Sequence, residues 1–284
     1  MLLDLFNILI FPGFVFLGVY ALIFSFLDRK MCARLQNRVG PPWFQPLADF
    51  LKLLGKETII PEDADKRVFK SLPVVAMATV TAAYLYIPIW SPHSLFPFEG
   101  DLIVVLYLLT IPTLTFFLAG WYSTSVYATI GAVRALTQLF SYEIPLFMAL
   151  LAPALLAGTW SLSGICAYYA ANPLYVLINL PALGVAIVAC QGKLERVPFD
   201  LPEAETEIVS GTFVEYSGRY YAIFRMAIDS ELVVVCSLIA AIFLPFYPVQ
   251  AWAGFLVYIA KTLFILFILA VFRSVMARVR IEQM

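Results

Sequence analysis

Acidic side chains are concentrated in one short stretch of this chain, ERVPFDLPEAETEIVSGTFVE at residues 195–215. Carboxyl groups that lie close together in surroundings of low polarity hold protons tightly, because burial and like charges both disfavour the ionised form. Apolar residues interrupt the acids and indicate partial burial of a proton or ion route, but the pattern alone supports a solvated acidic loop equally well. The six acids are Glu195, Asp200, Glu203, Glu205, Glu207 and Glu215.

The order of residues in this segment predicts a turn followed by a helix. Pro198 and Pro202 restrict the backbone on either side of Asp200. Asp200 suits a helix N-cap and Pro202 suits the first helical turn. Glu203 and Glu207 would then lie one turn apart on the same face, where like charges repel.

Single charges within apolar runs are a second chemical feature. The sequence IGAVRALTQLFSYEIP predicts that Arg134 and Glu143 lie around the start of a membrane helix, with Glu143 facing inward. Lys261 lies ten residues into another apolar run, where an unpaired ammonium costs about 2.5–3.5 kcal/mol on insertion scales. It therefore needs water or a carboxylate, and Asp229, Glu231 and Glu143 are the candidates. A structural ion pair without any transport role is the alternative.

The elements that must position these charges are membrane helices. The chain is 62% hydrophobic and only 13% charged, with a mean hydropathy of +0.90, which is typical of integral membrane proteins. The apolar runs are too long and too uniform for the strands of a β-barrel. We predict a single all-α polytopic domain over residues 1–284, with seven transmembrane helices. The predicted spans are about 5–27, 71–90, 102–122, 142–159, 173–190, 220–246 and 251–273.

The distribution of positive charge supports this number of spans. With seven helices, 17 of the 18 Lys and Arg residues fall on one side of the membrane. The positive-inside rule makes that side cytoplasmic, so we predict an inner or cytoplasmic membrane protein with its N-terminus outside and its C-terminus inside. Four scattered cysteines and one histidine predict no metal site. The chain has no phosphate-binding loop and no nucleophile set. We therefore expect no cofactor in this chain, and no nucleic-acid partner.

An amphipathic helix is predicted near residues 47–57, outside the membrane spans. Leu47, Phe50, Leu51 and Leu54 recur at helical spacing, and Asp49 lies off this apolar stripe. Such a helix lies along a membrane surface or packs beneath a helix bundle. The periodicity alone favours a plain anchor.

Five motifs, in order along the chain, resemble the complex I subunit 1 family. They are RLQNRVGP, QPLADFLKLLGKE, ATIGAVRALTQLFSYE, RVPFDLPEAETEIVSGTFVEYSG and the closing RVRIEQM. That family is the membrane subunit beneath the peripheral arm of respiratory complex I and of related membrane-bound NiFe hydrogenases. The resemblance implies a non-catalytic subunit that couples redox chemistry in a soluble arm to ion movement in antiporter-like membrane subunits.

The resemblance and the isolated charges together suggest two groups of site residues. In the family, acids of this kind line a polar funnel that leads from the redox junction into the membrane. The candidate ion-pathway residues are Glu143, Glu203, Glu205, Glu207, Glu215, Asp229 and Lys261. The candidate residues at the junction with the soluble arm are Asp28, Arg34, Arg38, Asp49, Arg134, Arg196 and Asp200.

Of four departures from the complex I pattern, the short loop between GP and QP and the missing eighth helix favour the hydrogenase-type branch or its sulfur-reducing relatives. Only three residues separate GP from QP, the first Glu of an ETNR-like motif is Lys193 or has moved to Glu195, the acid of AEY has moved to Asp229, and the chain stops before an eighth helix. The resemblance implies as partners a soluble NiFe-hydrogenase-like large subunit, an iron–sulfur small subunit, antiporter-like subunits and the bilayer. The NiFe centre and iron–sulfur clusters would belong to those partners.

Two other functions remain open from the sequence. The chain could form a quinone site in a complex I-like NADH or ferredoxin dehydrogenase, with Trp43 and Phe44 lining a cavity beside Asp49. It could also be a free-standing secondary transporter, which the lack of a visible internal repeat disfavours.

Overall fold

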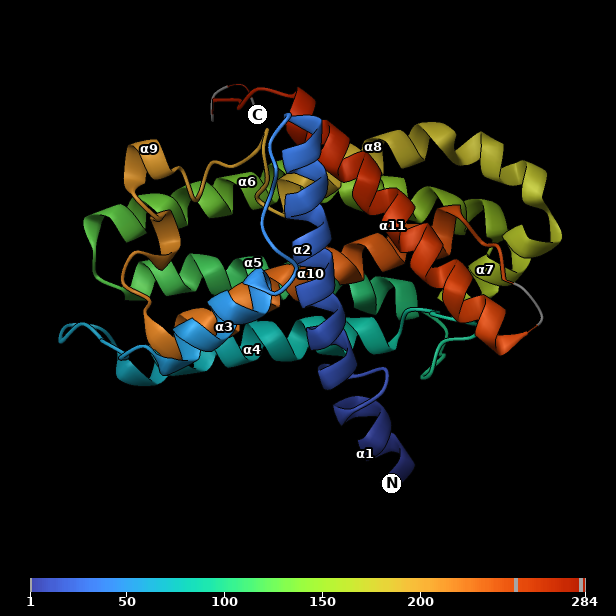
Figure 1. Cartoon of the computed structure of the whole chain (residues 1–284). Coiled ribbons are helices and arrows are strands. Elements are labelled where there is room, and N and C mark those ends of the chain that lie inside the picture. The colour runs from blue at the N-terminus through green and yellow to red at the C-terminus, as the bar shows by residue number, and fades with distance from the viewer. Residues whose placement is uncertain (1, 248–249, 281–282, 284) are drawn as a thin grey trace.

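A computed structural model describes residues 2–247, 250–280 and 283, and these residues form helices and loops without a β-strand (Figure 1). Seven helical segments are long and apolar enough to cross a membrane, so the predicted class of fold is confirmed. The spanning elements are α1 (Leu2–Leu9) with α2 (Phe14–Leu35), α4 (Lys66–Leu85), α5 (Asp101–Tyr122), α6 (Val126–Ala157), η1 (Pro173–Asn179) with α8 (Leu180–Lys193), α10 (Gly218–Phe243) and α11 (Ala251–Val275). The shorter elements are α3 (Gln45–Gly55), α7 (Leu162–Ala171), α9 (Glu205–Ile208) and η2 (Gly211–Phe213).

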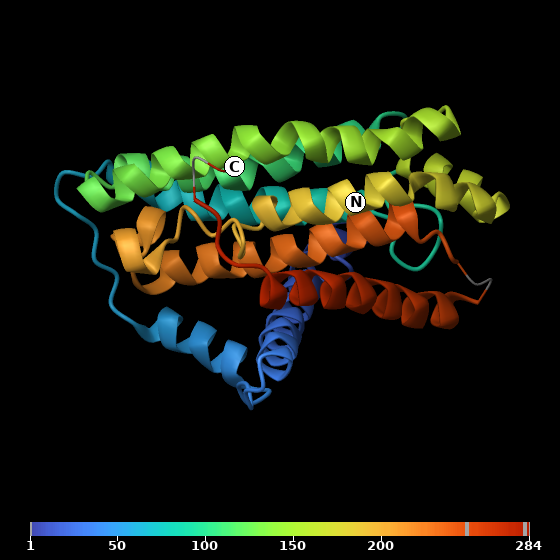
Figure 2. The same ribbon diagram turned by 90° about the horizontal axis from the view of Figure 1, so that it is seen from above.

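Helix α10 is the centre of the bundle. It passes between a layer that contains α5 and α6 and a layer that contains α2 and α11 (Figure 2). Of its most apolar 18-residue window, 89% is buried, the largest share among the seven spans. Asp229 and Glu231 are buried with it. Charged side chains on the central helix must therefore find partners inside the protein.

Helix α6 begins much earlier than the predicted start near residue 142. The added turns contain Ala128, Gly131, Ala132 and Ala135, which are all buried. Small side chains let this part of α6 pack closely against α5 and η2, although Arg134 and Gln138 lower its hydropathy. The prediction that Arg134 and Glu143 lie around the start of the helix is therefore wrong, because both lie well within it.

The acidic segment folds back on α6 instead of forming the predicted helix from Pro202. Only Glu205–Ile208 is α-helical, so Glu203 precedes the helix and does not share a face with Glu207. Gly211 has φ 50°, and a Cβ there would collide with the carbonyl oxygen of Pro202. The chain doubles back at this contact. Tertiary packing on α6 therefore overrides the local preference for a helix.

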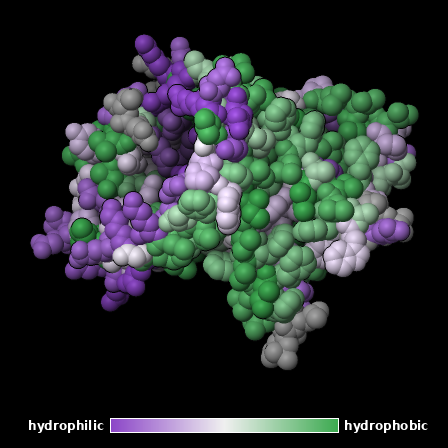
Figure 3. All heavy atoms as spheres, viewed as in Figure 1, coloured by the Kyte–Doolittle hydropathy of each residue, from purple (hydrophilic) through white to green (hydrophobic). Residues whose placement is uncertain are grey.

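Helix α3 confirms the predicted amphipathic element and begins two residues earlier than expected. Leu47, Leu51 and Leu54 are exposed, which leaves its apolar face available to lipid or to another subunit. Helix α2 runs steeply across the other long helices (Figure 1). Hydrophilic residues gather at the end of the bundle where α4 begins, and also where α2 ends, whereas the surface over α11 is largely hydrophobic (Figure 3).

Replacing Gly131 by alanine should loosen the acidic segment. A Cβ at this position would lie 2.7 Å from the carbonyl carbon of Gly211 and from the amide nitrogen of Thr212. Overpacking of this kind costs about 1–3 kcal/mol. We expect Gly131→Ala to lower the thermal unfolding midpoint and to expose residues 201–214 to protease. Gly184→Ala is the matched control in a helix, because among the described residues no atom beyond its chain neighbours and the adjacent backbone of its own helix lies within 4 Å of the added Cβ. Unchanged unfolding of Gly131→Ala would contradict the close contact.

Candidate functional site

A polar cavity of about 250 Å³ lies where α2, α10 and α11 meet the start of the acidic segment. This volume has room for several water molecules. The cavity brings together the predicted junction residues Asp28, Arg196 and Asp200 with the predicted pathway residue Glu203. The ionisable residues of its wall are the acids Asp28, Glu195, Asp200 and Glu203 and the arginines Arg29, Arg196, Arg225 and Arg273.

Asp28 is the fixed carboxylate of this cavity. Its side chain is 2% exposed and lies 3.0 Å from Arg196 and 2.8 Å from Arg273. These contacts tie α2 to α11 and to the acidic segment. Removing one partner from a buried ion pair of this kind costs about 3–5 kcal/mol. The geometry therefore makes Asp28 a structural anchor as well as a wall of the cavity.

The other predicted junction residues are spread around the same end of the molecule. Arg29 donates to Asp49 at 3.1 Å, and Gln45 donates to Asp49 at 2.8 Å, which fastens α3 to α2. Arg34 lies in the last turn of α2 and Arg38 in the loop that follows. Both are exposed, and neither lines the polar cavity.

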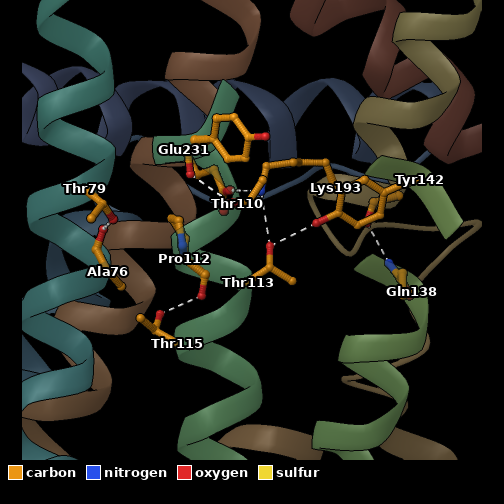
Figure 4. A network of polar contacts seen from close by, with 12 residues as sticks. Ala76, Thr79, Thr110, Pro112, Thr113, Thr115, Gln138, Tyr142, Lys193 and Glu231 are labelled. Atoms are coloured by element: carbon orange, nitrogen blue, oxygen red, sulfur yellow. Dashed lines mark hydrogen bonds and ion pairs between the residues drawn. The ribbon is translucent and has the colours of Figure 1, made fainter. Parts of the chain in front are cut away.

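A buried ion pair lies deeper in the bundle, between α8 and α10. Lys193 Nζ is 2.6 Å from Glu231 Oε1, and the two side chains are 1% and 2% exposed. In Figure 4 the Lys193 side chain points toward both Glu231 and Thr113. An ammonium and a carboxylate at this depth hold their charges only because they neutralise each other.

Two hydroxyl groups continue the polar contacts away from this pair (Figure 4). Lys193 Nζ donates to Thr113 Oγ1 at 3.2 Å, and Thr113 Oγ1 shares a hydrogen bond of 3.0 Å with the hydroxyl of Tyr142. The Gln138 amide donates to the carbonyl of Gly192 at 2.7 Å and holds α6 against α8. Hydrogen-bonded groups therefore connect the ion pair with the residue that precedes Glu143.

Glu195 lies between the polar cavity and the buried ion pair. It lines the cavity, and its Oε1 atom is buried without a hydrogen-bond partner among the described residues. Its backbone is in the left-handed region, with φ 50°, which is uncommon for a residue other than glycine. Burial raises the pKa of Glu195 well above its usual value, with the negative charges of Glu203 and Glu231 adding to the effect and Lys193 opposing it. Glu195 is thus the acid in this group that is best placed to carry a proton.

The remaining acids of the segment have different surroundings. Glu207 is exposed and accepts a hydrogen bond of 2.6 Å from Arg134, with Arg278 at 3.9 Å. Glu215 is half-buried and lies outside the cavity wall. The side chain of Glu205 lies outside the part of the chain that the structure describes. The six acids therefore do not line one common passage.

Glu143 is half-buried near the middle of α6 and does not line the polar cavity. Glu143 interacts electrostatically with the charge of Lys193. Its neighbours Tyr142 and Pro145 line a separate apolar cavity of about 360 Å³ between α6 and α8. The polar cavity thus ends short of Glu143, and the Lys193–Glu231 pair with its two hydroxyl groups lies between them.

Lys261 does not have, within residues 2–247, 250–280 and 283, the carboxylate partner that the sequence led us to expect. Its ammonium donates to the carbonyl of Leu244 at 2.9 Å and lies 4.0 Å from the centre of the Tyr247 ring. Glu231 is paired with Lys193 instead, and Asp229 lies 3.9 Å from Arg225. The carbonyl of Leu244, which directly follows α10, and the aromatic face satisfy the cation without an acid.

Lys193, Glu231 and Glu195 were missing from the predicted site. The sequence places Lys193 in a loop, because it follows an apolar run, and suggests Glu231 only as a partner for Lys261. Both residues could have been identified as candidates, because each charge lies at the edge of a long run of apolar residues. Their pairing depends on how α8 and α10 cross, which the local sequence does not specify.

Comparison with known proteins agrees with this architecture. Residues 7–284 match the family described as NADH dehydrogenase. The chain is 34% identical to an NADH-quinone oxidoreductase subunit of Dehalococcoides mccartyi (strain CBDB1), over 95% of this chain and 77% of that protein. It is also 34% identical to NADH-quinone oxidoreductase subunit 8 of Thermus thermophilus, over 92% of this chain and 75% of that protein.

A solved structure is similar over the whole length. It belongs to the membrane-bound sulfane sulfur reductase, an archaeal respiratory membrane complex. The similarity covers 100% of this chain and 93% of that chain, with a TM-score of 0.85 and 28% sequence identity.

The helical bundle and its buried charges therefore define a multi-pass membrane subunit of a complex I-like respiratory complex. The chain belongs to the NADH dehydrogenase family, as its motifs predicted, and it is similar to NADH-quinone oxidoreductase subunits.

The contact between Arg134 and Glu207 predicts a pH-dependent attachment of the acidic segment. The hydrogen bond and charge of Arg134 lower the pKa of Glu207 below its usual value. A lowered pKa in the folded state stabilises the attachment above the usual value of about 4.3, and this contribution is lost as pH falls through the lowered pKa. We expect Arg134→Gln to reduce the hydrogen-exchange protection of residues 205–214 at pH ~7 and to remove its dependence on acid pH.

Arg280→Gln is the control for this measurement, because it removes an exposed arginine from the same end of the molecule. Protection in Arg134→Gln that matches the wild type at every pH would exclude this ion pair as an attachment of the segment.

Proposed function

We propose that this chain is the membrane-anchor and ion-pathway subunit of a hydrogenase-type, complex I-related respiratory complex. It couples redox chemistry in a docked soluble arm to translocation of H⁺ or Na⁺. The soluble arm comprises a NiFe-hydrogenase-like large subunit and an iron–sulfur small subunit, and antiporter-like subunits adjoin this chain in the bilayer. The redox centres belong to the partners, and this chain supplies charged groups that respond to them.

The observation that carries this proposal is the series of ionisable groups that extends inward from the polar cavity. Glu195 lines the cavity, and Lys193 and Glu231 form the buried pair. Tyr142, which precedes Glu143 in the chain, shares a hydrogen bond with Thr113. Ionisable groups are costly at such depth and mark proton or ion routes in membrane proteins. A plain anchor would need none of them.

Electrostatics sets the size of the coupling. A unit charge about 10 Å from a buried carboxylate interacts with it by roughly 1.7 kcal/mol at an effective dielectric constant of about 20. That energy is worth a little more than one pKa unit, or about a tenfold change in proton occupancy. Reduction of a redox centre in a docked partner therefore needs no large movement of this chain to change where protons are held.

Two features support the hydrogenase-type branch or its sulfur-reducing relatives. The loop between Gly40 and Gln45 is short, which leaves little chain for a quinone tunnel. A solved structure to which this chain is similar over its full length belongs to a sulfane sulfur reductase. The distribution of Lys and Arg supports an N-terminus outside and a C-terminus in the cytoplasm, which would put the polar cavity next to the soluble arm.

The quinone-site alternative is less well supported. Asp49 is engaged by Arg29 and Gln45, and the cavity beside it has a volume of about 20 Å³. That space holds about one water molecule and no quinone ring. Trp43, which could line such a site, is 75% exposed.

Replacing Glu143 by glutamine should largely abolish redox-coupled ion pumping, because the amide cannot take up or release a proton at neutral pH. We expect at least a tenfold loss of ion uptake by proteoliposomes that contain the assembled complex, with assembly unchanged. Glu99→Gln is the control, since Glu99 is an exposed acid in the loop between α4 and α5. Full pumping by the assembled Glu143→Gln complex would remove Glu143 from the route.

The quinone alternative predicts a different result for Asp49. If the chain formed a quinone site, the purified complex would reduce a soluble quinone analogue, and Asp49→Asn would block this reaction. We expect no quinone reduction by the wild-type complex. Sustained quinone reduction that depends on Asp49 would replace the proposed function with the alternative one.

A further inference from the structure

The group formed by Lys193, Glu195 and Glu231 contains one ammonium and two carboxyl groups, and Glu195 is half-buried at the wall of the polar cavity. Lys193 and Glu231 are in contact at 2.6 Å and are almost fully buried. Glu195 contributes a buried oxygen to which no group in the described part of the chain donates a hydrogen bond. If both acids were ionised, the group would carry a net negative charge in surroundings that solvate charge poorly.

Charged groups from the neighbouring elements surround this cluster, but several of them are paired with other residues. Arg196 and Arg273 contact Asp28, Arg29 contacts Asp49, and Arg225 lies near Asp229. The acidic segment adds negative rather than positive charge around Glu195. The facing groups are Asp28 and Arg29 on α2, Tyr142 on α6, Arg225 and Asp229 on α10, Arg273 on α11, and Arg196, Asp200 and Glu203 on the segment.

A buried carboxylate without a matching cation is more stable in its protonated, neutral form. Lys193 neutralises one carboxylate, and the second carboxyl group is then neutral only if it binds a proton. We propose that Lys193, Glu195 and Glu231 form a proton-holding site, in which the two carboxyl groups together bind one exchangeable proton near a permanently charged lysine.

The position of this site fits storage of a proton in transit. On one side Glu195 lines the polar cavity, which has room for water. On the other side Lys193 donates to Thr113, which shares a hydrogen bond with Tyr142. Uptake transfers a proton from a hydronium ion in the cavity to a carboxylate oxygen of Glu195, which gives a carboxylic acid and a water molecule. Release restores the carboxylate, and Lys193 stays an ammonium throughout. This role in transport rests on the proposed function, whereas the number of protons bound by the two carboxyl groups does not depend on it.

The number of bound protons can be measured by infrared spectroscopy of the assembled complex at neutral pH. A protonated carboxyl group gives a carbonyl-stretch band that an ionised carboxylate lacks, and difference spectra between variants count the groups. Glu195→Gln should remove one equivalent of this band. Glu231→Gln should also remove one, because Lys193 would then neutralise Glu195. Lys193→Met should add one equivalent, because both acids must then be protonated.

Glu207→Gln is the control, since this exposed acid is paired with Arg134 and contributes no band. A band that survives Glu195→Gln would overturn the proposal. So would a band that survives Glu231→Gln, because the two acids would then not share one proton. The two glutamine variants are nearly isosteric with the wild type, so they decide the question even if Lys193→Met does not assemble.

Turnover is not needed for this experiment, so its outcome is independent of pumping. Normal pumping by Glu143→Gln together with the expected infrared changes would reject the proposed function and keep the proton-holding site. If Glu143→Gln abolishes pumping but Glu195→Gln and Glu231→Gln leave the infrared band unchanged, the proposed function would stand and the proton-holding site would be rejected.

Discussion

Helix α10 is buried on nearly all sides and still carries Arg225, Asp229 and Glu231. Each unpaired charge near the middle of a bilayer would cost several kilocalories per mole. The surrounding helices are therefore constrained to bring opposite charges to it, and α8 does so with Lys193. The packing of the bundle and the placement of its ionisable groups thus have a common physical cause.

The same principle organises the cytoplasmic end of the proposed topology. Asp28 draws Arg196 and Arg273 together from two distant parts of the chain, and Glu207 attaches its segment to Arg134. The close approach of Gly131 and Gly211 fixes the segment at a distance that side chains would prevent. The acidic segment is therefore a folded part of the wall rather than a solvated loop, although Glu207 itself faces outward.

Hydropathy and charge distribution predicted the seven spans and the amphipathic helix because these depend on composition and local periodicity. The start of α6 was missed because its buried face is made of alanine and glycine, which have little hydropathy of their own. The extent of α9 was missed because the turn at Gly211 depends on a contact with Pro202 nine residues away. Partners for Lys193 and Lys261 could not be predicted, since they depend on the crossing of helices that are far apart in sequence.

The end of the chain runs back over this wall. The amide of Val279 donates to the carbonyl of Pro198 at 3.0 Å, and Arg278 faces Glu207. The residues after α11 thus connect that helix to the acidic segment. Because Arg273 in the last turn of α11 contacts Asp28, a displacement of the residues that follow α11 would be passed through this contact to the wall of the polar cavity.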